Sequence, residues 1–120
     1  MGTFRDLIAY KKSFALSMDI FLMTKTFPKE ETYSLIDQIR RSSRSTFACI
    51  AEAYQKRRYP NHFVSKLTDA DMENAETRSW LDASLACSYI TSEKFAELDQ
   101  QADEISRLLI YMINNSEKFK

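Results

Sequence analysis

The scarcity of glycine and proline limits the fold of this chain more than any other feature. Its 120 residues include one glycine and two prolines. Sheet proteins need such residues repeatedly at their turns, so the composition argues strongly against a β-rich fold. A chain of 120 residues builds one hydrophobic core and has no room for a second. We therefore predict a single all-helical domain over residues 1–120.

Four apolar stripes with helical spacing follow one another along the chain. They predict helices over about residues 4–26, 28–58, 62–89 and 93–113. Pro28 ends the first helix and opens the second, because Phe27 before it is disfavoured in the α conformation. Tyr59-Pro60-Asn61 is the clearest break, with Asn61 as the expected N-cap of the third helix. Four such helices with short connections predict an antiparallel up-down-up-down four-helix bundle.

Each predicted helix has an expected core face. On the first helix this face comprises Leu7, Tyr10, Phe14, Met18, Phe21 and Leu22. On the second helix it comprises Ile36, Ile39, Ser43, Phe47, Ile50 and Tyr54. The third helix contributes Phe63, Leu67, Ala70, Asn74, Thr77, Leu81, Leu85 and Ser88, and the fourth contributes Phe95, Leu98, Ala102, Ile105, Leu109, Met112 and Ile113. Asn74 and Thr77 are polar and need hydrogen-bond partners if they are buried.

The opposite side of the second helix is unusually rich in small residues. It presents Arg41, Ser45, Ala48 and Glu52, flanked by Ser42, Cys49 and Ala51. Small side chains let another backbone approach closely, so one interpretation is a second packing surface. The other interpretation is a plain exposed face that happens to be rich in serine.

The charges of the chain are divided unevenly, although the net charge is zero. Residues 1–66 carry twelve Lys or Arg against six Asp or Glu, and residues 67–120 carry five against eleven. One interpretation is that basic and acidic helices pair within one molecule. The other is that a positive face meets a negative face on a neighbouring subunit, or meets nucleic acid.

The densest basic cluster lies on and after the second helix. The candidate nucleic-acid-binding residues are Arg41, Arg44, Lys56, Arg57, Arg58 and Tyr59. Guanidinium groups suit phosphate contacts, and Tyr59 can stack on a base. Basic residues in a last helical turn also interact favourably with the helix dipole, and a pI of about 6.6 is not typical of nucleic-acid-binding proteins.

Residues for catalysis or cofactor binding are scarce. Di-iron bundles need Glu-x-x-His pairs, but His62 is the single histidine and no Glu lies three residues before it. Glu73 and Glu76 form a carboxylate pair that we expect to neutralise Arg40 or Arg44 across the bundle. A phosphate-binding glycine loop cannot form with one glycine. We predict a protein that is not an enzyme and that holds no metal or cofactor.

The remaining features indicate an ordinary cytoplasmic protein. Cys49 and Cys87 lack CxxC spacing, so we interpret both as small buried hydrophobic residues in a reducing compartment. No apolar run is long enough to span a membrane, and no signal peptide opens the chain. We expect no membrane partner and no small-molecule substrate.

At QIRRSSRS, IAEAY and KRRYP the chain resembles a family of four-helix proteins encoded in intervening sequences of 23S ribosomal RNA genes. The similarity begins at Phe4-Arg5-Asp6-Leu7, continues through Trp80-Leu81 to Tyr89, and covers nearly the whole chain. The resemblance implies an antiparallel bundle that assembles into a homopentameric ring, with no established enzyme activity or cofactor. Accessory proteins of diversity-generating retroelements look like a related branch, whose basic pentamers engage nucleic acid and a reverse transcriptase.

A ring of this kind joins one surface of each subunit to a different surface of the next. The candidate interface residues are then Arg40, Arg41, Ser45, Ala48, Glu52, Glu73 and Glu76. Our leading hypothesis is a non-catalytic homo-oligomer of unestablished role. Its more specific version binds structured RNA or DNA through the basic surface of the second helix. The competing hypothesis is a structural or protein-interaction scaffold whose arginines serve subunit interfaces and which binds no nucleic acid.

Overall fold

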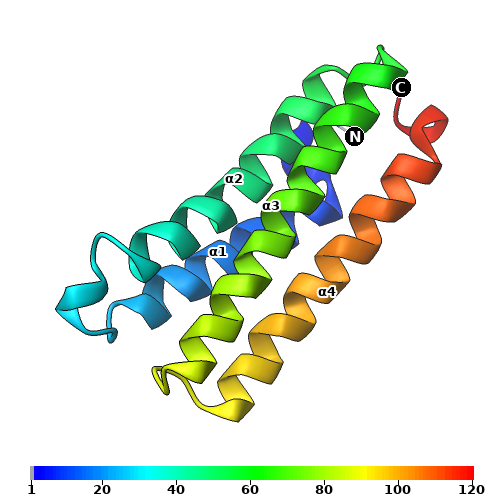
Figure 1. Cartoon of the computed structure of the whole chain (residues 1–120). Helices are drawn as coiled ribbons and strands as arrows, with labels where there is room; N and C mark the ends of the chain where they lie inside the picture. Colours follow the sequence, from blue (N-terminus) through cyan, green and yellow to red (C-terminus); the bar gives the residue numbers. More distant parts are fainter. Residues whose placement is uncertain (1) are drawn as a thin grey trace.

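The computed structural model describes residues 2–120 and contains four long α-helices (Figure 1). They are α1 (Ile8–Thr24), α2 (Leu35–Gln55), α3 (Pro60–Ala86) and α4 (Ser92–Asn114). Three 3-10 turns accompany them: η1 (Phe4–Asp6), η2 (Lys29–Glu31) and η3 (Ser116–Phe119). Residues 2–120 contain no strand, so the all-α prediction is confirmed. None of these helices is both long and apolar enough to cross a membrane.

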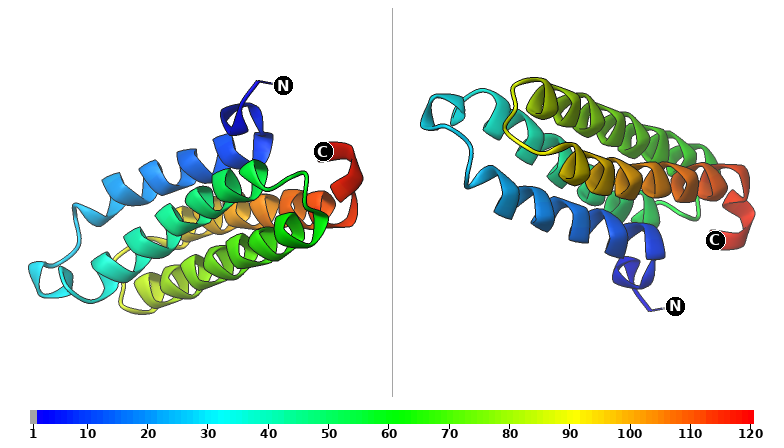
Figure 2. Two further views of the ribbon diagram at one scale, coloured as in Figure 1. Left: turned by 90° about the horizontal axis from the view of Figure 1, so that it is seen from above. Right: turned by 90° about the horizontal axis from the view of Figure 1, so that it is seen from below.

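The connections lie alternately at the two ends of the bundle, so consecutive helices run in opposite directions (Figures 1 and 2). One end holds the α2–α3 connection together with both chain termini, and we call it the terminal end. The other holds the α1–α2 and α3–α4 connections, and we call it the loop end. This arrangement agrees with the predicted four-helix bundle.

Side chains from all four helices fill the core. The largest apolar side chains among those that are fully buried are Ile20, Ile39, Ile50, Phe63, Leu67, Leu81, Leu98, Ile105 and Leu109. The predicted core faces of α3 and α4 are largely confirmed, because Phe63, Leu67, Ala70, Asn74, Thr77 and Leu81 are buried, as are Leu98, Ala102, Ile105, Leu109 and Met112. Burial of these apolar groups supplies the main driving force for folding.

The predicted core face of α1 is wrong. Phe14 and Leu22 lie at the surface, 42% and 61% exposed, and Tyr10, Met18 and Phe21 are only partly buried. The buried side chains of α1 are instead Ala9, Ser13, Leu16, Ser17, Ile20, Met23 and Thr24. The helix is therefore rotated, and it turns small and polar residues inward and large apolar residues outward.

Close packing explains this rotation. Small side chains let α1 lie close to α2, where Ser17 Oγ is 3.1 Å from Ser43 Oγ across the two helices. A helix that carries apolar residues on nearly every side has no single hydrophobic stripe, so periodicity cannot select its core face. Fit to the neighbouring helices decides the orientation instead.

The first helix also begins later than predicted. Leu7 has an extended backbone (φ −66°, ψ 130°) and separates η1 from α1, so no continuous helix begins at Phe4. Thr3 and Asp6 close η1 as a capping box, in which each side chain accepts a backbone N–H. Hydrogen bonds from the backbone N–H groups of Thr3 and Gly2 hold the pKa of the Asp6 carboxyl below its usual value.

The start of α3 corrects a second boundary. Pro60 is the first helical residue, and Tyr59 rather than Asn61 takes the N-cap position. Proline suits the first turn, where its missing N–H has no helical partner in any case. At its other end α3 stops at Ala86. Ser88 lies beyond this end with a positive φ of 61°, and its side chain is exposed, although we predicted it in the core.

A side-chain cap begins α4, and a further 3-10 turn follows its end. Thr91 caps α4, because its Oγ1 accepts a hydrogen bond from the backbone N–H of Lys94. After α4 the chain continues into η3. The ring of Phe119 on η3 lies 6.0 Å from that of Phe63 on α3, which holds the C-terminal segment against the bundle.

The two buried polar residues singled out on α3 find partners on neighbouring helices, whereas the buried Ser13 Oγ of α1 has no hydrogen-bond partner within residues 2–120. Asn74 Nδ2 on α3 donates to the carbonyl oxygen of Ala102 on α4 at 2.8 Å. Thr77 Oγ1 donates at 2.8 Å to Ser42 Oγ on α2. These two contacts fix the register of α3 against both neighbours.

Replacing Asn74 with Ala is expected to lower the free energy of unfolding by about 1–3 kcal/mol, because a buried interhelical hydrogen bond is lost and its acceptor remains buried. Urea denaturation at fixed protein concentration measures this difference. Ser79→Ala, at an exposed position of the same helix, is the control and should leave the midpoint nearly unchanged. Equal midpoints for the two variants would contradict the assigned role of Asn74.

At the loop end, Glu31 joins the two connections. Its carboxylate accepts hydrogen bonds from Ser34 Oγ (2.6 Å), Tyr89 Oη (2.8 Å) and the backbone N–H of Leu35 (3.3 Å). The hydrogen bonds of Ser34, Tyr89 and Leu35 hold the pKa of Glu31 below its usual value of 4.5. The same contact raises the pKa of Tyr89 to about 12. The ring of Phe27 lies 5.1 Å from that of Tyr89 and packs beside the contact.

The lowered pKa makes the Glu31 contact sensitive to acid. Its contribution to stability is present above pH 4.5, the unfolded-state value, and is lost as the pH falls through the lower folded-state pKa. Glu31→Gln is therefore expected to reduce the loss of stability below pH 4.5. Urea midpoints measured across this range for variant and wild type test this. Parallel curves for the two proteins would show that Glu31 carries no acid-linked stability.

Candidate nucleic-acid and subunit interfaces

The face between α1 and α2 gathers cations around one aromatic ring. Lys25 Nζ lies 4.7 Å from the centre of the Phe21 ring, Arg40 Cζ lies 4.8 Å from it, and Arg44 Cζ lies 5.9 Å from it. Cations attract the negative face of an aromatic ring. Within residues 2–120 none of these three cations forms an ion pair with a carboxylate. We call this face, with the aromatic residues described next, the α1/α2 face.

Aromatic side chains continue along the same face toward the terminal end. The Tyr10 ring lies 5.0 Å from that of Phe4 and 6.1 Å from that of Phe14. Phe47 of α2 meets this row, with its ring 5.1 Å from that of Phe14 and 5.8 Å from that of Tyr10. Because Phe14 and Phe47 are not fully buried, this row is part of the surface. The α1/α2 face is therefore both aromatic and positively charged.

The two arginines of the predicted subunit interface differ in how firmly contacts within the chain hold their side chains. Arg40 is held within the chain, because its Nε donates to Thr24 Oγ1 at 2.8 Å. Arg41 lies on the outer line of α2, where it pairs with Asp37 at 3.3 Å and remains exposed. Such an exposed pair contributes little to stability, so Arg41 can take part in other contacts.

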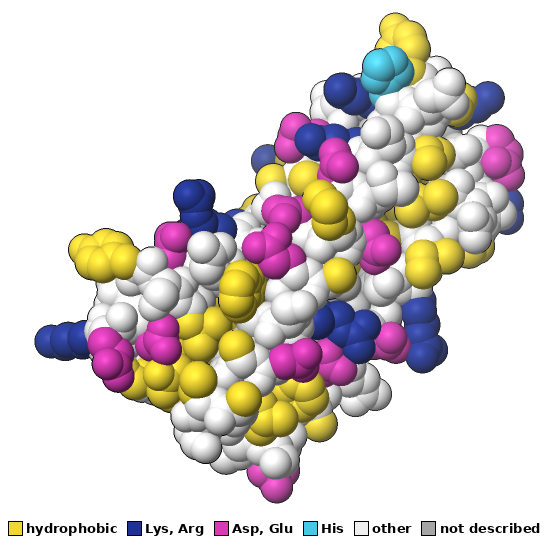
Figure 3. All heavy atoms as spheres, in the orientation of Figure 1, with side chains coloured by type: hydrophobic (Ala, Val, Ile, Leu, Met, Phe, Trp, Pro, Cys, Tyr) yellow, Lys and Arg dark blue, Asp and Glu magenta, His cyan; other side chains and the backbone are white. Residues whose placement is uncertain are grey.

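The face between α2 and α3 has the opposite charge. Its acidic residues are Glu52, Asp69, Glu73 and Glu76. Figure 3 faces this side and shows acidic side chains along α2 and α3 between hydrophobic patches. Lys66 is the cation in this set, paired with Glu52 at 3.4 Å and with Asp69 at 3.9 Å. We call this surface, with the exposed Met72 and the partly buried Trp80, the α3 face.

The predicted pairing of Glu73 and Glu76 with Arg40 or Arg44 is wrong. Within the described chain, none of these four side chains forms an ion pair with another of them. Glu76 instead accepts a hydrogen bond from Trp80 Nε1 at 3.4 Å. Arg40 and Arg44 stand beside Phe21 of α1, so α2 separates them from the two glutamates.

The small residues of α2 pack against α3 of the same chain. Ser42 and Cys49 are buried, and Ser42 meets Thr77 of α3 directly. Ser45 is partly buried, while Ala48 and Glu52 remain exposed. The flanking residues of this face are thus covered by α3 of the same chain, whereas the second packing surface along Arg41, Ser45, Ala48 and Glu52 stays a prediction.

The terminal end gathers basic groups from several segments. Lys56 and Arg58 are exposed in the α2–α3 connection, and Tyr59 beside them is 65% exposed. Arg5 of η1 and Lys118 of η3 lie at the same end, as the positions of the termini in Figure 2 show. No cluster in the sequence predicts this grouping, because folding brings together residues from the two ends and the middle of the chain. We call these five residues the basic end.

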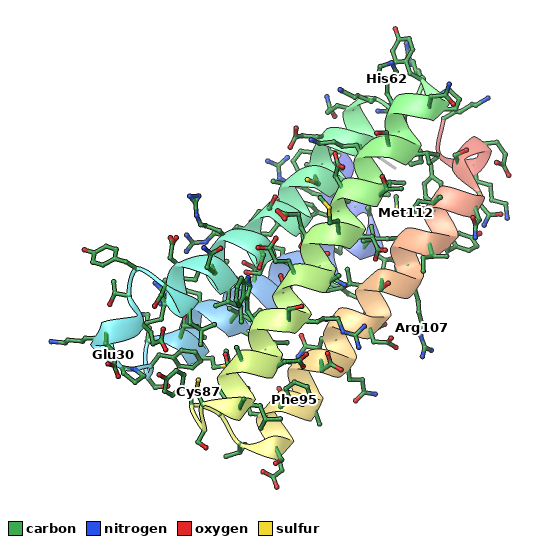
Figure 4. The ribbon with its side chains drawn as sticks, in the orientation of Figure 1. Glu30, His62, Cys87, Phe95, Arg107 and Met112 are labelled. Atoms are coloured by element: carbon green, nitrogen blue, oxygen red, sulfur yellow. The ribbon has the colours of Figure 1, made fainter. Side chains whose placement is uncertain are left out.

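Two further residues complete the description of this end. Arg57 is held within the chain, because its guanidinium lies 4.1 Å from the centre of the Tyr54 ring and donates to the Tyr54 carbonyl oxygen. His62 projects from the first turn of α3, as Figure 4 shows. A hollow of about 300 Å³ lies between Tyr59 and His62. The two rings meet edge to face, with their centres 6.1 Å apart and an interplanar angle of 83°, so the exposed surface of Tyr59 rather than the space between the rings is open to a base.

The structure divides the predicted nucleic-acid-binding residues into two groups. Arg41 and Arg44 lie near the middle of α2, whereas Lys56, Arg58 and Tyr59 lie beyond its C-terminus. At 1.5 Å per residue, the distance from Arg44 to Lys56 along the helix is roughly 18 Å. One phosphate group therefore cannot contact both groups.

The cysteines and the histidine do not meet. His62 and Cys87 lie at opposite ends of the bundle (Figure 4). Cys49 is buried as predicted, and burial raises the pKa of its thiol, but Cys87 is exposed at the end of α3, which contradicts the prediction for that residue. In the described part of the chain, no three His, Cys, Asp or Glu side chains come together as a metal site would require.

Comparison with known proteins shows the family to which the chain belongs. Residues 5–111 match the family model described as "23S rRNA-intervening sequence protein". The fold matches a crystal structure of a protein of unknown function from the S23 ribosomal protein family of Bacteroides thetaiotaomicron, with a TM-score of 0.83 and 31% sequence identity. The match covers 92% of this chain and 99% of that one, whereas no curated protein matches the sequence. The four-helix chain described above therefore belongs to the 23S rRNA-intervening sequence protein family.

Proposed function

We propose that this protein is a non-catalytic, cytoplasmic homo-oligomer that binds structured RNA or DNA through its basic end. The number of subunits, five, rests on the family resemblance. The basic end replaces the middle of α2 as the nucleic-acid-binding surface, and Arg41 and Arg44 pass to the subunit contacts. The observation that carries the proposal is the grouping of exposed cations from three segments at one end of the bundle.

Lys56 and Arg58 are the most accessible cations of the basic end, whereas Arg5 lies over the Phe4 ring and Lys118 Nζ donates to Tyr111 Oη at 3.3 Å. Within residues 2–120 none of Arg5, Lys56, Arg58 and Lys118 forms an ion pair with a carboxylate. Asp6 is the acid close to them in η1, and it is occupied by its own capping hydrogen bonds. Tyr59 adds an exposed ring on which an unpaired base can stack. Cations beside an exposed aromatic ring are the usual means of binding looped RNA.

Oligomerisation explains how a chain of zero net charge can bind nucleic acid. Cyclic symmetry repeats the basic end once in every subunit, so several weak phosphate-binding surfaces act on one ligand. Linked binding of this kind raises affinity without any new contact. The neutral pI of the single chain therefore does not set the affinity of the assembly.

A salt titration tests the proposal. Fluorescence anisotropy of a labelled RNA hairpin measures the affinity at 50 mM and at 200 mM salt. Four phosphate contacts predict a loss of about a hundredfold over this range, because each contact contributes a slope of roughly −0.7 to −0.9 in log K against log salt. No binding at either salt concentration, or an affinity independent of salt, would contradict the proposal.

A protein scaffold is the second candidate function. The observation that favours it is that Arg40 and Arg57 are held by contacts within the chain and are not free to contact phosphate. A scaffold would bind no RNA hairpin at 50 mM salt and would still assemble. The titration thus distinguishes the two functions.

A further inference from the structure

We propose that the subunits join by packing the α1/α2 face of one copy against the α3 face of a second copy of this chain. This inference rests on the proposed function, because it requires a homo-oligomer, and it adds which surfaces meet. The occupant of the α1/α2 face is thus a named surface of the chain itself.

The first step is that the outer surface of α1 is built to be covered. Phe14 and Leu22 are 42% and 61% exposed on the outer side of α1, whereas Ile8, 60% exposed, lies on the side of α1 toward Leu108 and Tyr111 of α4. Serines occupy the inner side of the same helix at positions 13 and 17. A helix with apolar groups on its exposed side and small polar groups inside has two packing surfaces. The exposed Phe14 continues into Tyr10 and Phe47 through ring contacts, and an exposed apolar patch of this kind marks a protein interface.

The second step is that the covering partner must be acidic. Lys25, Arg40 and Arg44 surround the Phe21 ring and have no carboxylate partner within the described chain. Bringing an apolar surface against these cations would remove them from water at a high cost in free energy. A partner that supplies carboxylates beside apolar groups avoids this cost. Charge complementarity therefore selects the partner.

The third step is that the chain carries such a surface elsewhere. The α3 face presents Glu73 and Glu76, whose carboxylates form no ion pair within residues 2–120. Met72 beside them is 61% exposed, and Trp80 is only partly buried. Methionine and tryptophan are adaptable or large apolar contacts that suit interfaces. This surface has the negative charge that the α1/α2 face lacks, together with apolar groups that can pack against the aromatic row of that face.

The fourth step is that the two surfaces cannot meet within one molecule. They lie on opposite sides of α2, which packs against both α1 and α3. Two copies of the α1/α2 face would repel one another, as would two copies of the α3 face. The remaining arrangement joins unlike surfaces head to tail, and repetition of that contact gives a ring when the rotation between neighbours closes and a filament when it does not. In this arrangement the basic first half of one subunit faces the acidic second half of the next, so the two subunits attract each other.

The test is a charge reversal with rescue. The first variant is Lys25→Glu/Arg44→Glu, the second is Glu73→Arg/Glu76→Arg, and the third combines all four substitutions. Sedimentation velocity over a dilution series measures association, and circular dichroism establishes that each variant is folded. Each double variant is expected to associate at least about tenfold more weakly, because like charges then face each other. The combined variant restores opposite charges and is expected to assemble like the wild type.

The control and the outcomes separate this inference from the proposed function. Asp82→Arg reverses an exposed charge on another side of α3 and is expected to leave association unchanged. A wild-type monomer would overturn both the homo-oligomer and this inference. A wild-type oligomer whose double variants assemble normally, or whose folded combined variant stays dissociated, would overturn the pairing of these faces alone.

Discussion

Replacing Phe63 with Ala is expected to lower the free energy of unfolding by about 3–5 kcal/mol. The side chain is fully buried at the start of α3, and its ring packs near that of Phe119. Truncation leaves a cavity that rigid helices cannot close, so the cost of the empty volume adds to the lost burial of apolar surface. A domain of this size has a total stability of only about 5–15 kcal/mol, so this variant approaches the limit of folding.

Urea denaturation followed by circular dichroism measures this difference. Protein concentration must be the same for all variants, because subunit association adds to the apparent stability. Tyr33→Ala is the matched control, since this aromatic side chain is 94% exposed and its removal should change the midpoint little. A loss below 1 kcal/mol for Phe63→Ala would show that the start of α3 is not packed as described.

Removing Lys56, Arg58 and Lys118 together is expected to weaken binding of an RNA hairpin by roughly a hundredfold at 0.1 M salt. Each lost phosphate contact reduces the slope of log K against log salt by about 0.7 to 0.9, and three contacts make the effect large. The triple Ala variant should keep its fold, because exposed helix-end charges contribute little to stability. Anisotropy measured over a salt series gives both the affinity and the slope.

The control for this variant removes the same charge elsewhere. Lys29 and Lys94 lie at the loop end, and Arg107 projects from α4 (Figure 4). Their triple Ala variant has the same net charge as the first, so it separates position from overall charge. Equal losses of RNA affinity for the two triple variants would mean that the position of the charges does not matter. An unchanged slope of log K against log salt in the first variant would show that the basic end does not contact phosphate groups.

The helices follow from local patterns that leave few alternatives. The stripe of α4 is clear enough that its core face is predicted nearly residue by residue. On α3 the stripe is weaker, but few large apolar residues compete with Phe63, Leu67 and Leu81 for the core. Even the polar members of the α3 stripe, Asn74 and Thr77, find the partners that burial requires. Periodicity succeeds wherever one side of a helix meets water.

The same reasoning fails for α1 because that helix carries apolar residues on almost every side. Periodicity then ranks Phe14 and Leu22 as core residues on size alone, whereas packing places Ser13 and Ser17 inside. Which side of α1 faces the core depends on how closely the α1 and α2 backbones approach. That distance cannot be read from the spacing of apolar residues in the sequence. We attribute the failure to the large apolar residues that α1 carries on its outer side, the side that the proposed subunit contact would cover.

The candidate surfaces show a similar division. Sequence reasoning finds Lys56 and Arg58 because they are neighbours in the chain. It cannot add Arg5 and Lys118, because η1 and η3 lie at the same end of the bundle only after the helices have packed. Nor can it separate Arg44 from the basic end, because that distance depends on helical geometry.

The central claim is that the protein assembles with copies of itself and that the assembly binds structured nucleic acid. Native mass spectrometry of the full chain, mixed with an RNA hairpin at low ionic strength, tests both parts in one spectrum. We predict a single oligomer, five subunits if the family resemblance holds, that carries RNA and loses it as ammonium acetate is raised. A spectrum of free monomers without bound RNA would contradict the account.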